Sequence, residues 1–168
     1  MINRSKLKQF FGVGPIGALF TIAMWAISLV LEKVLNISQI QIHPILRTAF
    51  ITVFTIDALY LLIGSNYQIR KQDKGDVLMT KGPYQFIRHP IYSAWVYSFT
   101  GILSMMLFSW AIILSVISIN LFWSWLVIYE ENKMLNKFGN SYKDYMSKTG
   151  QFLPSWKAMK ESFVENPD

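Results

Sequence analysis

The chain has 168 residues, a length typical of one domain. It is 52% hydrophobic and only 15% charged, which excludes the composition of an ordinary soluble domain. The net charge is +6 and cysteine is absent, so neither a disulfide framework nor a thiolate metal site is possible.

The apolar residues lie in three long runs that are almost free of Asp, Glu, Lys and Arg. These runs are 9–31, 48–69, which is interrupted only by Asp57, and 91–129. A membrane-spanning helix needs about 20 residues, so the first two runs predict one span each. The third run is long enough for two spans and predicts a tight helical hairpin with its apex in 104–110. We therefore expect an all-α, polytopic integral membrane protein with about four transmembrane helices.

The basic residues predict how these helices are oriented. Lys33 and Arg47 are the only Lys or Arg residues between the first two runs, whereas the others precede the first run or follow the second and third. The positive-inside rule then places both termini and the loop 70–90 in the cytoplasm. This positive surface suits an anionic lipid leaflet. Because the basic residues flank membrane spans and form no separate arm, we do not expect nucleic acid as a partner.

We expect one membrane domain over 1–168. Residues 1–69 hold two N-terminal spans, 70–154 hold the candidate site, and 155–168 form a tail on the membrane surface. After the third run the helix is predicted to continue to Phe138 and to stop at Gly139. A short cytoplasmic helix that contains Tyr142 and Tyr145 should follow.

Two features inside the spans have competing interpretations. Gly12, Gly14 and Gly17 formally match a dinucleotide fingerprint, but no strand precedes them, so small residues that ease helix packing are the favoured interpretation. Asp57 lies near the middle of the second run. An ionisable residue at that depth is a functional candidate, and the alternative is a structural aspartate that is hydrogen-bonded to a polar residue of another helix.

A polar site is predicted where the hairpin returns to its starting surface. The hairpin would bring Glu130 and Glu131 beside Arg88 and His89. Carboxylates and tyrosine rings together suit a polar ligand with a cationic centre. The alternative to a ligand site is that these charged side chains only extend from the helix ends to the membrane–water interface. No metal site is expected, because His43, the only other histidine, lies on the opposite side of the membrane.

The motifs G-P-Y-Q-F-I-R-H-P-I-Y, E-E-N-K-M-L-N-K-F-G-N-S-Y-K-D-Y and T-G-x-F-L-P, separated by a hairpin, resemble the isoprenylcysteine carboxyl methyltransferase family. This is the wider group of integral-membrane methyltransferases that includes phospholipid methyltransferases, and the resemblance covers about 76–154. It implies an S-adenosylmethionine-dependent methyltransferase that acts on a lipidic or prenylated substrate at the cytoplasmic leaflet. A phospholipid N-methyltransferase-like enzyme is the alternative that the resemblance leaves open.

The same resemblance implies which residues hold S-adenosylmethionine. Glu130 is expected to balance a cationic group of the cofactor, His89 to meet its polar ends, and Glu131 to support the site or act as a base. Arg88 completes the candidate catalytic group. The cofactor-binding residues carried over from the family are Asp76, Val77, Leu78, Met79, Tyr84, His89, Pro90, Ile91, Tyr92 and Glu130.

One position departs from the family pattern. The isoprenylcysteine enzymes place an arginine one turn before the first glutamate, where it can bind a substrate carboxylate, and Leu126 stands there in this chain. Lys148 or Arg88 could reach in from elsewhere. An apolar wall is nevertheless easier to reconcile with a neutral or amine-bearing lipid than with a carboxylate.

Two further interpretations of the function remain open from the sequence alone. Membrane sterol and steroid reductases share a related R-H-P-x-Y turn and use a nicotinamide cofactor, but no additional basic residues lie near the glutamate pair to bind a 2′-phosphate. A non-catalytic lipid-binding protein that retains the framework is the other alternative. The sequence leaves the oligomeric state and the methyl acceptor open.

Overall fold

The computed structural model describes residues 12–71 and 77–156. The N-terminal basic segment 1–8, Asp76 and most of the predicted tail, 157–168, lie outside the described residues. The elements in chain order are α2 (Gly14–Val34), α3 (Pro44–Lys71), the 3-10 helix η1 (Gly82–Gln85), α4 (Pro90–Ser93), the π-helix η2 (Ala94–Phe99), α5 (Thr100–Leu107), α6 (Trp110–Phe138) and α7 (Asn140–Lys148).

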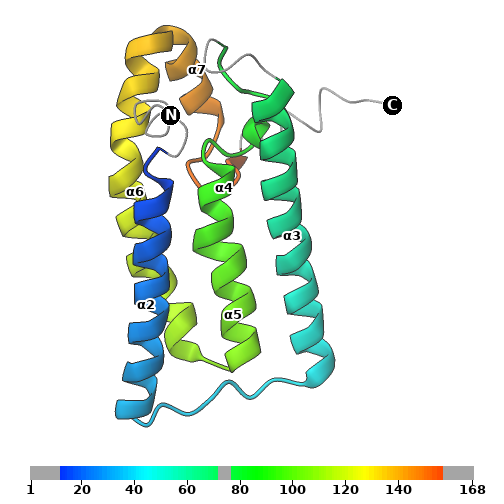
Figure 1. Ribbon diagram of the computed structural model, residues 1–168. Helices are drawn as coiled ribbons and strands as arrows, with labels where there is room; N and C mark the ends of the chain where they lie inside the picture. Colours follow the sequence, from blue (N-terminus) through cyan, green and yellow to red (C-terminus); the bar gives the residue numbers. More distant parts are fainter. Residues whose placement is uncertain (1–11, 72–76, 157–168) are drawn as a thin grey trace, which may run out of the picture.

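The long helices run side by side along one axis (Figure 1). Among the described residues, α2, α3 and α6 are each long and apolar enough to cross a membrane. The elements α4, η2 and α5 follow one another without a break and form a composite helix over 90–107 between α3 and α6. The prediction of an all-α membrane protein is confirmed. The count of four membrane crossings stays a prediction, because the composite helix is not among those three long helices.

Prolines explain where the first two helices begin. The run 9–31 predicted the first span, whereas α2 begins at Gly14 with Pro15 in its first turn. Similarly, α3 begins at Pro44, four residues before the predicted run 48–69. Proline fits the first turn of a helix because the N–H that it lacks would have no partner inside the helix there.

The predicted hairpin is present, with its turn inside the expected segment 104–110. The first arm ends at Leu107, and Phe108 adopts a left-handed conformation with φ of 54°. The second arm begins after Ser109, whose side chain accepts a hydrogen bond from the backbone N–H of Ile112. Arg47 supports this costly turn, because its guanidinium lies 4.1 Å from the centre of the Phe108 ring.

Charged residues satisfy both helix ends at this turn. Arg47 Nε donates to the carbonyl of Met105 at 3.0 Å, at the C-terminal end of α5. Glu32 of α2 accepts from the Ser109 hydroxyl and, at 3.2 Å, from the backbone N–H of Trp110, the first residue of α6. The cation therefore lies at a helix C-terminus and the carboxylate at a helix N-terminus, as the helix dipoles favour.

The composite helix is joined by polar side chains to the helices on both sides. In its π-helical part, Ser98 donates to Asp57 Oδ2 of α3 at 2.6 Å. Just beyond, Thr100 accepts from Trp25 Nε1 of α2 at 3.1 Å. The interpretation of Asp57 as hydrogen-bonded to a polar residue of another helix agrees with this contact.

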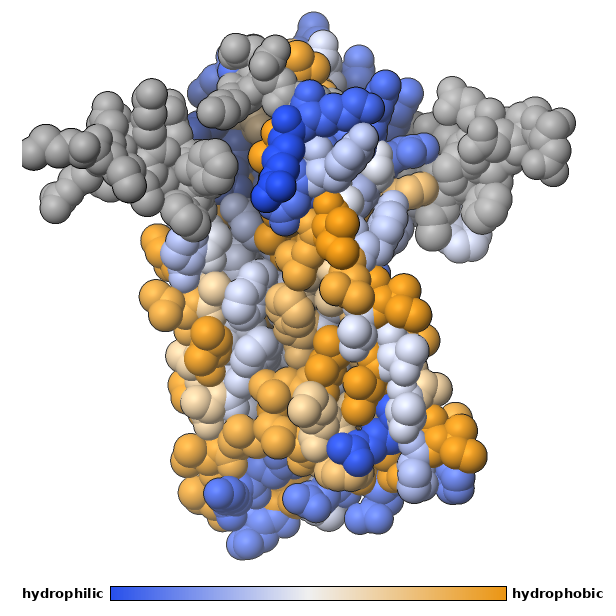
Figure 2. Space-filling model, turned by 45° about the vertical axis from the view of Figure 1, so that its right-hand side comes forward, coloured by the Kyte–Doolittle hydropathy of each residue, from blue (hydrophilic) through white to orange (hydrophobic). Residues whose placement is uncertain are grey.

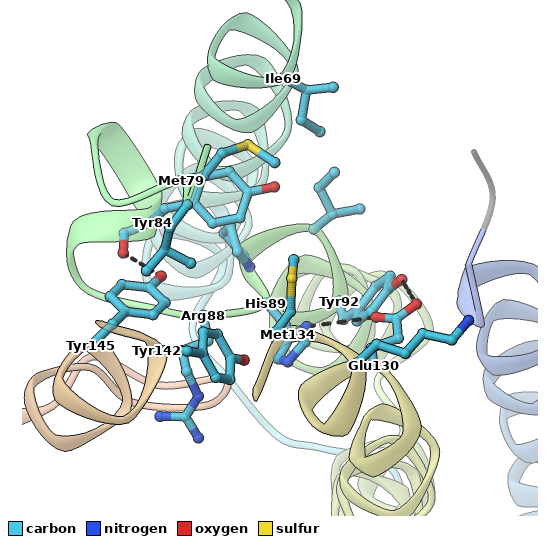
Figure 3. A pocket seen from close by; sticks show the side chains of 14 residues that line it. Ile69, Met79, Tyr84, Arg88, His89, Tyr92, Glu130, Met134, Tyr142 and Tyr145 are labelled. Atoms are coloured by element: carbon cyan, nitrogen blue, oxygen red, sulfur yellow. Dashed lines mark hydrogen bonds and ion pairs between the residues drawn. The ribbon is translucent and has the colours of Figure 1, made fainter. Parts of the chain in front are cut away.

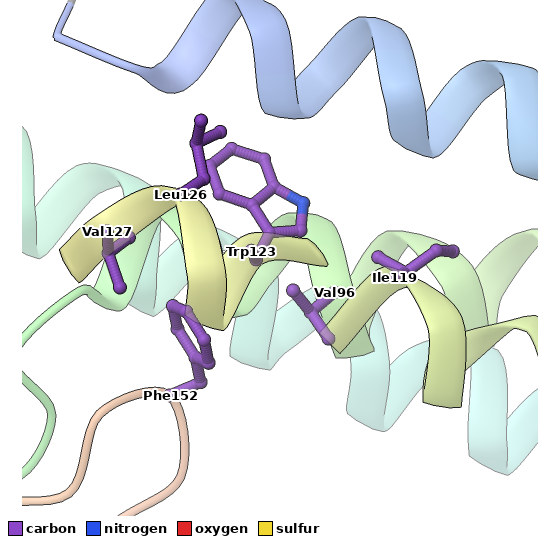
Figure 4. Close-up of a cluster of buried hydrophobic side chains, with 6 residues drawn as sticks. All are labelled: Val96, Ile119, Trp123, Leu126, Val127 and Phe152. Carbon is purple, nitrogen blue, oxygen red and sulfur yellow. The ribbon is translucent and has the colours of Figure 1, made fainter. Parts of the chain in front are cut away.

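The largest core cluster lies where α6 meets α2 and the composite helix (Figure 4). Trp123 points from α6 towards α2, where its Nε1 donates to Thr21 at 2.9 Å. A Cβ on Gly17 would lie 2.3 Å from this indole ring, so the close approach requires glycine. The interpretation of this glycine as a packing residue is confirmed. The cluster consists of Val96, Ile119, Trp123, Leu126, Val127 and Phe152.

The segment after α7 returns to the start of the hairpin. As predicted, α6 ends at Gly139, where φ is +55°, and α7 follows directly. Ile87 and Gly150 then form an isolated parallel β-bridge. The backbone N–H groups of Arg88 and His89 donate to the carbonyls of Gly150 and Gln151 at 2.8 and 3.1 Å. These bonds fix the backbone that carries the candidate site.

Candidate active site

A cavity of about 360 Å³ lies at the open end of the hairpin (Figure 3). Tyr84, Tyr145 and Met79 surround one side of it, and His89, Tyr92 and Glu130 lie on the other. The cavity is therefore aromatic and apolar on one side and polar on the other. Its lining residues are Ile69, Leu78, Met79, Tyr84, Arg88, His89, Pro90, Ile91, Tyr92, Glu130, Lys133, Met134, Tyr142 and Tyr145.

Glu131 joins the two arms of the hairpin and contacts Arg88 and His89, two residues that line this cavity. Its Oε1 accepts from Arg88 Nε at 2.9 Å and lies 3.2 Å from His89 Nε2. Gln151 Nε2 approaches the same oxygen at 3.5 Å. The side chains of Arg88, His89 and Glu131 are each only 11% exposed, so the charges are shielded from water and hold one another in place.

The guanidinium of Arg88 has further partners in the protein. Its Nη1 donates to the carbonyl of Thr149 at 2.6 Å and to that of Met146 at 3.3 Å. With Glu131 on Nε, the group ties the first arm of the hairpin to α6 and to the end of α7. These contacts hold the guanidinium in place, and part of the Arg88 side chain also lines the cavity.

Glu130 is turned towards the cavity and is held by three groups. Its Oε1 accepts from the backbone N–H of Val13 at 2.9 Å and from the Tyr92 hydroxyl at 3.1 Å. Its Oε2 lies 3.9 Å from His89 Nδ1. A Cβ on Gly12 would lie 2.2 Å from Oε1, so the chain before α2 passes directly over the carboxylate. The arrangement leaves an oriented negative charge at the wall of the cavity.

The tyrosines on the aromatic side remain neutral. Burial raises the pKa of Tyr84 to about 12. Burial, reinforced by the negative charge of Glu131, also raises the pKa of Tyr142 to about 12. The Tyr145 hydroxyl donates to the carbonyl of Tyr84 at 2.7 Å, which fixes the aromatic wall. These phenols offer ring faces and hydrogen-bond donors rather than bases.

The structure brings most of the sequence-predicted site residues together. Val77 is 55% exposed and does not line the cavity, and Asp76 lies outside the described residues. Glu131 is not among the residues that line the cavity. The predicted residues that do line it are Leu78, Met79, Tyr84, Arg88, His89, Pro90, Ile91, Tyr92 and Glu130.

Several contributors were not predicted. Lys133 and Met134 follow Glu130 on the same helix face, so helical spacing could have identified them. Tyr142 and Tyr145 were placed on the right helix without a role in the site. The backbone N–H of Val13 carries no sequence signal, because any residue except proline offers that group.

Together, the fold and the site define a helical membrane protein whose hairpin holds a half-polar, half-aromatic ligand pocket at its open end. Residues 60–141 of the chain match the family described as phospholipid methyltransferase. The match includes the hairpin and all the cavity residues except Tyr142 and Tyr145.

Two named relatives are also similar to this chain. The protein-S-isoprenylcysteine O-methyltransferase of Dictyostelium discoideum is 31% identical over 106 residues, which cover 54% of this chain and 40% of the relative. The enzyme of the same name from Tribolium castaneum is 30% identical over 97 residues, which cover 56% of this chain and 34% of the relative. The matched region thus spans two fifths or less of these relatives' length. No solved structure matches significantly.

These findings confirm the resemblance that the motifs indicated. Over the matched region the chain is similar to membrane methyltransferases of the isoprenylcysteine carboxyl methyltransferase-like family.

Proposed function

We propose that the protein is an integral-membrane methyltransferase that uses S-adenosylmethionine and acts on a lipidic or prenylated substrate. The main support is that the hairpin brings Glu130 and His89 to one cavity from opposite ends of a long apolar run. The similarity to enzymes named as methyltransferases gives this cavity its chemical interpretation.

The residues of the cavity fit this cofactor. A volume of about 360 Å³ lies in the range of small-molecule sites. S-adenosylmethionine carries a sulfonium cation, an aromatic base and charged amino-acid groups. The carboxylate of Glu130 suits a cationic group, and the neutral rings of Tyr84 and Tyr142 suit an aromatic and partly apolar one.

The contribution of the protein to the reaction is orientation and exclusion of water. When bound, S-adenosylmethionine would supply an electrophilic methyl group, with its sulfur as the leaving group in the form of a neutral thioether. Glu130 and His89 hold the ligand in one orientation, and alignment of this kind accounts for much of the rate of a two-substrate reaction. Glu131 contacts His89 and keeps it in place, and Arg88 in turn holds Glu131.

The acceptor is a lipid of neutral or amine-bearing type in this proposal. A shallow groove of about 420 Å³ begins one turn before Glu130, and no basic side chain is among the residues that line it. Leu126 lies in this groove at the position where the resemblance implied an arginine. This observation favours the phospholipid N-methyltransferase-like alternative over methylation of a carboxylate. The groove is lined by Val13, Trp125, Leu126, Ile128, Tyr129 and Asn132.

The cavity opens at the cytoplasmic surface in this proposal. In Figure 1, α7 lies at one end of the molecule and the turn between α5 and α6 lies at the other. The cavity belongs to the α7 end, because Tyr142 and Tyr145 of α7 line it. The basic residues of the sequence concentrate on the segments that lead to the cavity end. The positive-inside rule therefore assigns that end to the cytoplasm.

Calorimetry with S-adenosylmethionine tests the cofactor assignment. The variants Glu130→Ala and His89→Ala should lose detectable binding, since each removes a polar group from a shielded cavity. Lys143→Ala changes an exposed residue of α7 outside the cavity and should bind normally. Unchanged binding in both cavity variants would overturn the assignment, and so would binding of NADPH in place of S-adenosylmethionine.

Incubation with total lipid extract and methyl-labelled S-adenosylmethionine tests the acceptor. The labelled product should be a lipid that carries a methylated amine or another neutral group. A labelled methyl ester of a prenylated carboxylate would instead support the isoprenylcysteine type of reaction.

A further inference from the structure

The described residues contain one buried side-chain hydroxyl that makes no hydrogen bond within them, that of Ser65 on α3. Ser65 is 0% exposed, so its hydroxyl is also shielded from solvent. A buried hydroxyl without a partner costs free energy, because it gives up its hydrogen bonds to water and gains none in return. Such a group in a folded protein calls for an explanation.

The three threonines of the same helix show what Ser65 does not do. They lie on the outside of the bundle, where apolar side chains are spread along the surface (Figure 2). Thr48, Thr52 and Thr55 each donate to the carbonyl four residues earlier, at 3.0, 2.9 and 2.7 Å. The hydroxyl of Ser65 makes no such bond to Leu61, so it is available to a group outside its own helix.

Tyr84 of η1 is the group that the Ser65 hydroxyl acts on. Burial raises the pKa of Tyr84, and the Ser65 hydroxyl partly offsets this rise, as a donor directed at a phenol oxygen does. Close packing of α3 against η1 brings the two residues together. A Cβ on Gly64, the neighbour of Ser65, would lie 2.7 Å from Cγ of Pro83, the neighbour of Tyr84.

Ser65 lies next to the cavity and does not line it. Tyr84 does line the cavity (Figure 3), and so does Ile69, one helical turn after Ser65. Any effect of Ser65 on a ligand therefore passes through another residue. Because its pKa is raised to about 12, Tyr84 is neutral and its phenol can both donate and accept a hydrogen bond.

We propose that Ser65 is a positioning residue that acts on the ligand through Tyr84. When S-adenosylmethionine fills the cavity, the Ser65 hydroxyl donates to the phenol oxygen of Tyr84. The phenol O–H then donates to an acceptor atom of the ligand, which offers ring nitrogens, hydroxyls and a carboxylate. This proposal rests on the proposed function, because S-adenosylmethionine is the ligand that it concerns.

The state of Ser65 makes the hydrogen bond a contribution to binding rather than to folding. In this structure the hydroxyl is buried and unbonded, so it does not stabilise the folded chain. A bond that forms only in the complex stabilises the complex alone. Linked hydroxyls also polarise one another, so a Tyr84 phenol that accepts from Ser65 becomes a better donor to the ligand.

Ser65→Ala distinguishes this role from a structural one. Without ligand, the melting temperature should stay the same or rise, because alanine has no polar group to satisfy. Calorimetry should show that S-adenosylmethionine binds roughly 3- to 10-fold more weakly, the effect of losing one neutral hydrogen bond. Thr55→Ala removes a hydroxyl that bonds to its own helix and should bind the cofactor normally.

Tyr84→Phe tests whether the effect passes through Tyr84. This variant should weaken binding by itself, and Ser65→Ala added to it should weaken binding no further, since the two residues act as one unit. S-adenosylhomocysteine, which lacks the sulfonium charge, should lose affinity for Ser65→Ala by the same factor as S-adenosylmethionine.

The possible failures of the two proposals can be told apart. A Ser65→Ala variant that is less stable than the parent, or does not fold, would show that the hydroxyl has a structural role. Equal affinity in variant and parent would show that the ligand does not use it. Either result, or additive losses in the double variant, would overturn the role of Ser65 and leave the proposed function standing. A parent protein that binds no S-adenosylmethionine would overturn both.

Discussion

Arg88 Nε lies 2.9 Å from Glu131 Oε1, although the two residues are 43 positions apart in the chain. Both side chains are 11% exposed, and the same carboxylate oxygen is also next to His89. The ion pair therefore closes the hairpin and orients a cavity residue at the same time.

Loss of one partner of this pair should be strongly destabilising. Glu131→Ala leaves the Arg88 guanidinium with an uncompensated charge, for which we expect about 3–5 kcal/mol of lost stability. The double variant Arg88→Met with Glu131→Leu should recover most of the loss, because it leaves no unpaired charge. Thermal unfolding in detergent measures both effects. A double variant that is no more stable than Glu131→Ala would contradict this account.

A separate prediction concerns the charge of Glu130. Glu130→Gln keeps an oxygen for the Val13 N–H and the Tyr92 hydroxyl but removes the negative charge. We expect S-adenosylmethionine to bind roughly 10- to 100-fold more weakly, the effect of losing one hydrogen bond to a charged group. Thermal stability should change little. Calorimetry and a melting curve on the same sample separate the two effects, and full affinity would rule out a role for the charge.

Two glycines of α2 form a matched pair for a test of packing. A Cβ on Gly17 would lie 2.3 Å from Trp123, whereas one on Gly14 would meet only Tyr92, at 3.4 Å. Gly17→Ala should therefore cost about 1–3 kcal/mol, as overpacking of a core usually does. Gly14→Ala should be tolerated. The melting temperatures of the two variants decide the point, and equal values would argue against close contact between α2 and α6.

The far end of the hairpin should affect stability without affecting the cavity. Glu32→Ala leaves the Ser109 hydroxyl and the Trp110 N–H without their acceptor, which should cost roughly 1–3 kcal/mol. Lys33→Ala changes a neighbouring charge that makes no such contact with the described residues 12–71 and 77–156, and it serves as the control. Affinity for S-adenosylmethionine at a temperature where both variants are folded should be unchanged. A weaker affinity in the Glu32 variant would show that the two ends are coupled.

The tyrosines predict a loss of stability in alkali. The folded-state pKa values of Tyr84 and Tyr142 are raised from 10.0 to about 12. The folded protein therefore holds these protons more tightly than the unfolded chain, and this contribution to stability is complete below pH 10 and lost as pH rises towards 12. Tyr84→Phe and Tyr142→Phe should each reduce the slope of stability against pH over this interval. Identical slopes for the variants and the parent would contradict the raised values.

The sequence predicted the parts of the fold that depend on long apolar runs and on chain-breaking residues. The hairpin turn was expected in 104–110 and lies there, and the stop at Gly139 was also correct. Helix starts were less accurate. Apolar runs mark where a helix can be buried, whereas Pro15 and Pro44 determine where α2 and α3 begin.

In the candidate site, side chains with a distinctive chemistry could be predicted from the sequence, whereas contacts made by the backbone could not. His89 and Glu130 were predicted to converge, and both line the cavity. The different roles of Glu130 and Glu131 were predicted only through the family resemblance. The residue types alone do not separate them, because adjacent residues of a helix point in different directions and their surroundings decide which one faces the cavity. The N–H of Val13 and the carbonyls of Gly150 and Gln151 carry no side-chain signal.

The partners of Arg88 also have a consequence for biosynthesis. A ribosome that has just incorporated Arg88 must add 61 further residues before Thr149, whose carbonyl receives the guanidinium, exists at all. During translation every described membrane helix is therefore complete before the site can close. A nascent chain interrupted between Phe138 and Thr149 would contain the Arg88–Glu131 ion pair and still lack the Thr149 carbonyl that accepts from Nη1 of Arg88.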